Sequence, residues 1–224
     1  MTTELRFAAS KNSGEVSALL NVPPESKALL VFGHGAGAGM RHAFMASMSA
    51  ALAGRGIATF RYQFPWVEQE RRAPDPQPAL LATVRAAVRA AKAGAPDLPL
   101  FAGGKSMGGR MTSLAATAEP LDGVHGIPFF AFPLHPAGRP STDRAAHLAA
   151  VRVPLLFLQG TRDTLAQLDL LRPVVAGLPG PATLHVIEDA DHGFHVRRST
   201  GRRDAEVIGE LADVVAAWMA AVLA

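Results

Sequence analysis

The chain has 224 residues, of which 49% are hydrophobic and 18% are charged, and its formal net charge is +3. This length fits one domain over residues 1–224, and the high apolar fraction with its small net charge excludes disorder for most of the chain. Because the chain has no cysteine, disulfides, iron–sulfur clusters, thiolate zinc sites and a thiol nucleophile are excluded.

Short apolar runs and segments of helical periodicity alternate along the chain. Two runs near the start, at residues 6–8 and 16–20, predict an antiparallel hairpin. Six further runs are continuously apolar and bounded by Gly or Pro, as strands buried on both faces are; they lie at residues 28–33, 57–62, 98–103, 127–132, 154–160 and 182–187. Helices are predicted between them, at about residues 41–54, 77–94, 107–118, 143–150, 165–177 and 204–223. This alternation predicts an α/β fold with a mostly parallel central sheet, helices on both faces and the hairpin at one edge.

The loop after the third of these six strands carries the first chemical motif. The run at residues 98–103 leads into G-K-S-M-G at residues 104–108, and a predicted helix follows. A G-x-S-x-G pattern between strand and helix is typical of a nucleophilic serine at the apex of a sharp turn, where small neighbours let the backbone approach. Ser106 is therefore the candidate nucleophile. The alternative is a glycine-rich turn in which the serine only caps the helix.

A serine hydroxyl needs an adjacent base, which the last strand loop can supply. In hydrolases with this serine turn, the chain order is serine, then acid, then histidine. His192 follows the run at residues 182–187, and Gly193 beside it leaves room for the imidazole to reach inward. We prefer His192 to His195 because His192 lies nearer the strand end, where ligands of such sheets bind.

The third group of this constellation is an acid that orients the histidine. Asp163 comes from a different strand and can approach the imidazole from the side, whereas Asp189 and Asp191 share a loop with His192 and could make only a strained local contact. The alternative for Asp163 is a cap on a helix that begins at Thr164. Asp189 and Asp191 with the two histidines of that loop could also form a metal cluster, but this would leave the serine turn unexplained, and we predict no metal.

The glycine-rich loop at residues 34–39, H-G-A-G-A-G, follows the run at residues 28–33. Acyl transfer needs two N–H donors for the oxyanion, one from the residue after the nucleophile and one from a loop after an earlier strand. Met107 and Ala36 occupy these places. A dinucleotide site is the alternative for this loop, but its spacing is not G-x-G-x-x-G and no acidic residue ends the next strand, so we predict no cofactor.

These motifs, in this order, resemble those of the α/β-hydrolase superfamily over nearly the whole chain. Three further stretches are similar to the dienelactone-hydrolase-related branch of small cap-less predicted hydrolases, which includes testis-expressed and NSL-complex-subunit-like proteins. They are F-R-Y-Q-F-P at residues 60–65, R-R-A-P-D-P at residues 71–76 and F-P-L-H-P at residues 132–136. Dienelactone hydrolases themselves use a cysteine nucleophile, which this chain lacks, so their substrate does not carry over.

The resemblance implies a role for each residue singled out above. By that resemblance, the nucleophile is Ser106, the base His192, the orienting acid Asp163, and the oxyanion donors Ala36 and Met107. The implied fold is an α/β-hydrolase fold, and the implied activity is that of a serine hydrolase.

The sequence also bears on the substrate. Only about ten residues separate Phe132 from the helix near residue 143, which leaves no room for a helical cap. We therefore expect an open cleft bordered by the loops at residues 63–72 and 133–140. The side chains expected to contact substrate are His34, Arg61, Phe64, Trp66 and Phe194. Such a mixture of apolar and cationic groups suggests small or extended esters with a carboxylate.

The leading hypothesis is therefore a serine hydrolase that cleaves a carboxylic ester. Its alternatives are an acyltransferase or thioesterase with the same triad, and a non-catalytic interaction module. Nucleic acid is not expected as a partner, because the basic pairs at residues 71–72, 197–198 and 202–203 are scattered without interleaved aromatic residues. The chain has no membrane-span pattern and no signal-peptide layout at its start, so we expect a cytoplasmic protein with a small-molecule, ester-like substrate.

Overall fold

A computed structural model of the chain describes residues 2–10 and 13–224. Within this part of the chain, eight strands form one sheet, in the order β1-β2-β4-β3-β5-β6-β7-β8. They are β1 Thr2–Ser10, β2 Gly14–Asn21, β3 Ala28–Gly33, β4 Ile57–Tyr62, β5 Leu100–Lys105, β6 Ile127–Phe130, β7 Leu155–Gly160 and β8 Ala182–Ile187.

The antiparallel part of the sheet lies at one edge. β1 pairs antiparallel with β2, and β2 pairs antiparallel with β4. Every neighbouring pair from β4 to β8 is parallel. β3, β4, β6 and β7 are buried along their whole length, as continuously apolar strands should be. The predicted hairpin and the mostly parallel sheet are both confirmed.

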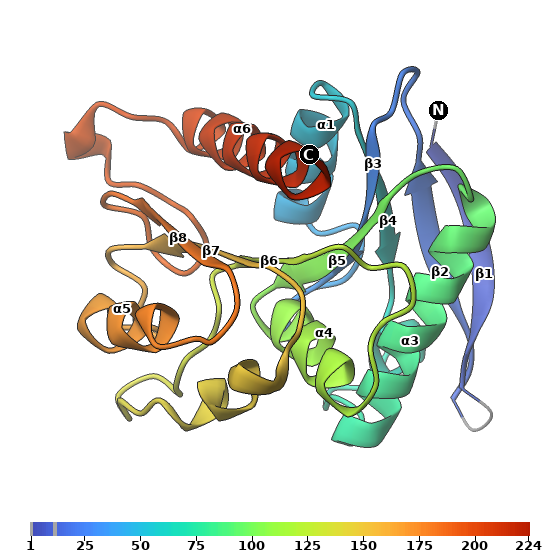
Figure 1. Ribbon diagram of the computed structural model, residues 1–224, viewed down its shortest axis with the longest axis horizontal. Helices are drawn as coiled ribbons and strands as arrows, with labels where there is room; N and C mark the ends of the chain where they lie inside the picture. Colours follow the sequence, from blue (N-terminus) through green and yellow to red (C-terminus); the bar gives the residue numbers. More distant parts are fainter. Residues whose placement is uncertain (1, 11–12) are drawn as a thin grey trace.

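Helices cover both faces of this sheet, as Figure 1 shows. α1 Ala43–Ala53 and α6 Asp204–Leu223 lie on one face, and α3 Gln77–Gly94, α4 Met107–Ala118 and α5 Leu168–Ala176 lie on the other. The short α2 Pro65–Glu68 follows β4, and two 3₁₀ helices lie at Asp143–Ala150 and Arg198–Thr200. No helix in the described ranges has both the length and the apolar character that a membrane crossing requires.

The structure differs from the sequence predictions at several elements; β5 begins at Leu100 and not at residue 98, and β6 ends at Phe130 and not at residue 132. β5 continues two residues further than predicted, to Lys105, because β3 and β6 pair with it along its glycines. The segment Asp143–Ala150 is a 3₁₀ helix and not an α-helix, and its ends are closed by bonds to the third residue back, such as Val151 N–H to the Leu148 carbonyl. α2 was not predicted, since a single turn of four residues has no periodicity to detect.

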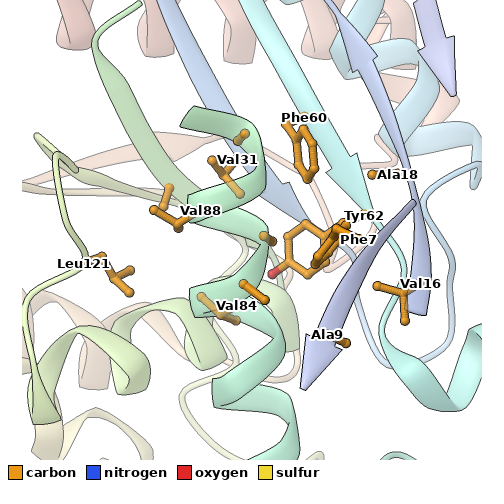
Figure 2. Packing of buried hydrophobic residues seen from close by; sticks show 14 of the residues in the cluster. Phe7, Ala9, Val16, Ala18, Val31, Phe60, Tyr62, Val84, Val88 and Leu121 are labelled. Atoms are coloured by element: carbon orange, nitrogen blue, oxygen red, sulfur yellow. The ribbon is translucent and has the colours of Figure 1, made fainter. Parts of the chain in front are cut away.

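Apolar side chains fill the spaces between the sheet and its helices. Between the sheet and α3, the ring of Phe7 lies 5.8 Å from that of Phe60 and 6.4 Å from that of Tyr62, measured between ring centroids. Val84 and Val88 of α3 pack in the same cluster, as Figure 2 shows. This packing fastens the edge hairpin to the parallel sheet.

A second aromatic cluster is formed by side chains of β6, of β7 and of the segment that follows β6. The ring centroid of Phe157 lies 4.7 Å from that of Phe129 and 5.8 Å from that of Phe132, and all three side chains are buried.

We expect Phe157→Ala to lower the free energy of unfolding by about 3–5 kcal/mol, because it removes a ring and leaves a cavity. Urea unfolding followed by circular dichroism measures this, and Leu223→Ala, at an exposed site, should change it by less than about 0.5 kcal/mol. Equal effects of the two variants would contradict this account of the core.

Candidate active site

The turn between β5 and α4 carries Ser106. Its backbone angles are φ +50° and ψ −116°, a left-handed conformation that residues other than glycine rarely adopt. The strand runs to Lys105 and the helix begins at Met107, so this one residue makes the whole change of direction. Its N–H donates to the carbonyl oxygen of Phe130 over 2.9 Å, which ties the turn to β6. Such strain persists only where the surrounding structure enforces it, and it concentrates at functional sites.

Close backbone contacts explain the two glycines of the motif. A Cβ atom on Gly104 would lie 2.4 Å from the carbonyl oxygen of Gly33, and a Cβ atom on Gly108 would lie 2.3 Å from the same oxygen. Only glycine therefore lets β3, β5 and the first turn of α4 approach this closely. The Ser106 side chain makes no capping hydrogen bond to α4, so the alternative of a capping serine is wrong.

The structure brings Ser106, His192 and Asp163 together. Nε2 of His192 lies 2.8 Å from Oγ of Ser106, and Nδ1 lies 2.7 Å from Oδ2 of Asp163. Because a carboxylate only accepts hydrogen bonds, the imidazole proton is on Nδ1, and Nε2 is free to accept the serine proton. The Asp163 side chain is fully buried, whereas that of His192 is 26% exposed. The three residues follow β5, β7 and β8, so their meeting depends on the sheet.

Asp163 is held by two further donors. Leu165 N–H donates to Oδ1 over 2.8 Å, and the side-chain amide of Gln159 donates to Oδ2. Gln159 is not among the predicted site residues, although it is the one amide side chain in an otherwise apolar strand. α5 begins at Leu168, so the alternative that Asp163 caps a helix starting at Thr164 is wrong.

The rival residues of the last loop have other partners. Nδ1 of His195 lies 2.6 Å from Asp204, and Asp191 accepts the N–H groups of Gly193 and His195 within its own turn. Asp189 accepts hydrogen bonds from the Arg197 guanidinium, which lower the pKa of that carboxyl to about 2. Among the described residues, no three acidic or histidine side chains converge as metal ligands do.

The glycine-rich loop after β3 is fixed by His34. Phe64 N–H can only donate, so Nε2 of His34 accepts it over 3.2 Å, and Nδ1–H donates to the Gly35 carbonyl over 2.8 Å. A further bond, from Ala38 N–H to the same carbonyl, closes a turn with Ala36 near its centre. The other predicted donor, Met107, is the first residue of α4, where a helix leaves its N–H groups without intrahelical partners.

Four residues that sequence analysis assigned to substrate contact lie outside the main cavity. His34, Arg61 and Phe64 are buried by packing, since the end of β4 lies beside the glycine-rich loop and its side chains support that loop. Nη1 of Arg61, for example, donates to the Met40 carbonyl over 3.1 Å. Trp66 borders a second, open depression of about 540 Å³ that adjoins the main cavity, since residues 36–38 and His42 line both. For these four residues the structure corrects the expected position, and we assign the first three to loop support.

The main cavity has a volume of about 660 Å³ and is mostly apolar. It is bordered by residues 35–47 on one side and by residues 192–208 on the other, and not by the loops at residues 63–72 and 133–140 as expected. Ser106 and His192 line it, and so does Phe194, the one predicted contact residue that the structure places there. The residues that line it are Gly35, Ala36, Gly37, Ala38, His42, Ala43, Phe44, Met45, Ser47, Lys105, Ser106, Leu165, His192, Gly193, Phe194, His195, Asp204 and Ile208.

A mostly parallel eight-stranded sheet with a strained serine turn after a central strand and, over residues 2–10 and 13–224, no cap above that turn defines an α/β-hydrolase fold. The chain belongs to the alpha/beta hydrolase family: the family model described as an alpha/beta hydrolase domain matches residues 26–220.

Solved structures with this fold are similar over almost the whole chain. A dienelactone hydrolase from Anabaena variabilis superposes with a TM-score of 0.75 and 17% identity, covering 97% of this chain and 96% of that one. A serine hydrolase without a lid from Xanthomonas campestris gives a TM-score of 0.73 and 22% identity, covering 97% and 94%. The predicted cap-less fold of the dienelactone-hydrolase-like branch is thereby confirmed.

Two curated relatives from strains of Mycobacterium tuberculosis are each 31% identical over 183 residues and bear the provisional name of a phosphoribosyl transferase. The aligned region covers 80% of this chain but 39% of those proteins. The chain therefore spans about two fifths of the length of the curated relatives it matches.

The hydrogen bonds of His34 predict a fixed tautomer that does not titrate near neutral pH. Burial lowers the pKa of His34 to about 4, so its imidazole should stay neutral with the proton on Nδ1 from pH 8 to pH 5. Long-range ¹H–¹⁵N NMR during a pH titration measures both properties, and His195, whose pKa Asp204 raises, serves as the titrating reference. Titration of His34 with a midpoint near pH 6.5 would contradict this assignment.

The same shift has a consequence for stability. An unfolded histidine binds a proton below about pH 6.5, whereas His34 in the folded state does not do so until about pH 4. The unfolded state therefore binds more protons in this window, and acidification through it should lower the free energy of unfolding by about 3 kcal/mol from this residue.

Proposed function

We propose that the protein is a serine hydrolase that cleaves a carboxylic ester, or a related acyl bond, through an acyl-enzyme intermediate. The observation that carries this proposal is the continuous hydrogen-bonded chain from Ser106 through His192 to Asp163. Ser106 and His192 both line the main cavity, which supports access of a substrate to the serine hydroxyl. Membership of the alpha/beta hydrolase family supports the same reaction class.

In the first half of the proposed cycle, Oγ of Ser106 attacks the ester carbonyl carbon. The Oγ–C bond forms as the serine proton moves to Nε2 of His192, which is 2.8 Å away in the free enzyme. Asp163 keeps the other imidazole proton on Nδ1 and stabilises the imidazolium that forms. The bond from the carbonyl carbon to the leaving alkoxide then breaks, and the alkoxide takes its proton from Nε2.

In the second half, water replaces the alcohol. His192 takes a proton from water as its oxygen attacks the acyl carbon, and the bond from that carbon to Oγ of Ser106 then breaks. The proton passes from Nε2 to the serine oxygen, and the carboxylic acid leaves. Each half of the cycle thus ends with His192 in the neutral tautomer that the Asp163 hydrogen bond favours.

The tetrahedral intermediates carry a negative oxygen that needs donors. We assign the N–H groups of Met107 and Ala36 to this role. The position of Met107 at the start of α4 supports this assignment, because the first N–H groups of a helix favour negative charge. Ala36 supports it as a lining residue of the same cavity, in the loop held by His34.

The cavity supports a small organic ester as substrate. Its volume of about 660 Å³ lies within the range of about 300–1,000 Å³ that is usual for pockets that bind small molecules. We do not extend the phosphoribosyl transferase name to this chain, because the match covers 39% of those relatives.

A fluorophosphonate probe tests the nucleophile directly. We expect wild-type protein to be labelled at Ser106, because the probe phosphonylates a serine that an adjacent base activates. Ser106→Ala should remain unlabelled, as read by intact-protein mass spectrometry and peptide mapping. Wild-type protein that reacts no faster than this variant would contradict the proposed function.

The chain offers a matched control for that experiment. Oγ of Ser113 also lies 2.8 Å from a histidine nitrogen, Nε2 of His147, but Ser113 is fully buried and does not line the main cavity. Ser113→Ala should therefore be labelled as fast as wild type. Loss of labelling in Ser113→Ala would mean that the reactive serine is Ser113 and not Ser106.

Asp163→Asn tests the orienting acid. An asparagine amide would donate to Nδ1 and force the imidazole proton onto Nε2, where it opposes the serine proton, so kcat should fall by about 10³–10⁴-fold. Hydrolysis of 4-nitrophenyl acetate measures this, and Asp122→Asn, at an exposed loop position, is the control that should keep wild-type kcat. A loss of less than tenfold in Asp163→Asn would remove this aspartate from the mechanism.

A further inference from the structure

Lys105 is a charged residue of the cavity that the proposed cycle does not use. It immediately precedes Ser106 and lines the same cavity. Its Nζ donates a hydrogen bond to the backbone carbonyl of His192. The same nitrogen lies 5.7 Å from the ring centroid of Phe44 and 5.4 Å from that of Phe194. These two rings stack on each other, with centroids 5.7 Å apart and planes 17° apart.

This ammonium lacks the partner that a charge in such surroundings usually has. Among the described residues, no carboxylate oxygen lies within 4.0 Å of Nζ, and the carbonyl of His192 accepts only one of its three N–H groups. The aromatic faces attract the cation but accept no conventional hydrogen bond. A half-buried cation that faces a mostly apolar cavity, with two N–H groups that no acceptor among the described residues takes, is suited to bind an anionic group of a ligand.

The surrounding charges agree with this view. Burial lowers the pKa of Lys105 to about 8, and the more distant carboxylates of Asp163 and Asp191 offset only part of that effect. The other titratable groups of the cavity wall are His42, His192, His195 and Asp204, of which Asp204 is engaged with His195. An anionic group of a ligand in this cavity would therefore bind at Lys105, the residue that directly precedes the proposed nucleophile Ser106.

We propose that Lys105 binds a carboxylate of the substrate, so that the preferred substrates are esters that carry a negative charge. This inference rests on the proposed function of Ser106 and adds the substrate class. Lys105 thereby replaces Arg61 as the candidate anion-binding residue, because Arg61 is buried and does not line the main cavity. Lys105 would then determine specificity without taking part in bond making or breaking.

A structural role for Lys105 is the competing explanation, because its bond to the His192 carbonyl also steadies the catalytic loop. That role requires one hydrogen-bond donor, not a charge, and it affects all esters alike. A specificity role instead changes the ratio of kcat/KM between charged and neutral esters. The ratio therefore separates the two explanations even where absolute activity changes.

Two pairs of esters test the proposal. In each pair, one member carries a free carboxylate and the other carries the methyl ester of that carboxylate. The acyl-side pair is 4-nitrophenyl hydrogen adipate and its methyl ester, and the alcohol-side pair is 4-acetoxybenzoate and its methyl ester. In wild-type protein we expect kcat/KM to favour the charged member of at least one pair. In Lys105→Met that preference should fall by about 10- to 100-fold, the usual effect of a hydrogen bond between charged groups, whereas Lys105→Arg should retain most of it.

Two controls keep the test decisive. Lys92→Met makes the same change at an exposed site on α3 and should leave the preference as in wild type. Wild-type protein alone gives a second readout: the preference should fall as pH rises through about 8, where Lys105 loses its charge. This readout holds even where the Lys105→Met variant does not fold.

The outcomes separate this inference from the proposed function. Equal use of charged and capped esters by wild type, or equal losses for both in Lys105→Met, would overturn the substrate class while leaving the hydrolase intact. Absent probe labelling of Ser106 would instead overturn the proposed function. As a readout without turnover, 4-hydroxybenzoate should slow probe labelling of wild type more than its methyl ester does, and equal slowing counts against Lys105.

Discussion

The contact on which the site depends is the close approach of three glycines. The carbonyl oxygen of Gly33, at the end of β3, lies against both Gly104 and Gly108, where no side chain fits. This contact sets the distance between the loop that begins at His34 and the turn that carries Ser106. The strained backbone of Ser106 persists because β5 holds it on one side and α4 on the other. The turn with Ser106 and the loop to which we assign the oxyanion donor Ala36 are therefore packed directly against each other, while His192 and Asp163 come from the neighbouring half of the sheet.

The end of β4 supplies the second support of that unit. β4 is the parallel neighbour of β3, so its last residues lie beside the loop after β3. Nε2 of His34 accepts the Phe64 N–H. The Met40 N–H donates to the Gln63 side chain, and the Met40 carbonyl accepts a hydrogen bond from Arg61. Burying polar groups is costly unless they are bonded, and these bonds to the loop offset part of that cost, although Nε of Arg61 has no hydrogen-bond partner within the described residues. The stretch at residues 60–65, noted for its resemblance to relatives, thus has a structural explanation.

The fold and the meeting of Ser106, Asp163 and His192 could be predicted because their signals are local and ordered. Continuous apolar runs identify β3 to β8, and Ser106, Asp163 and His192 each follow a strand in the order that the serine turn requires. The direction of loop side chains could not be predicted, because it depends on single backbone angles. Phe194, with φ +66°, lines the cavity, whereas Phe64, in an extended conformation, packs against the rings of His34 and Trp66. Gln159 escaped notice because a single amide in an apolar strand does not indicate its partner, and its bond to Asp163 is visible only in the folded chain.

The pair of Ser113 and His147 shows what a serine–histidine contact lacks when it stands alone. Its hydrogen bond is as short as that between Ser106 and His192, at 2.8 Å. Yet no carboxylate in the described chain lies within 4.0 Å of the His147 ring, and burial together with the Arg110 charge lowers the pKa of His147 to about 4. A histidine so disfavoured in its charged form is a poor acceptor for a serine proton. What distinguishes Ser106 is therefore the buried acid behind the histidine and the cavity in front of the hydroxyl, both of which the arrangement of the strands supplies.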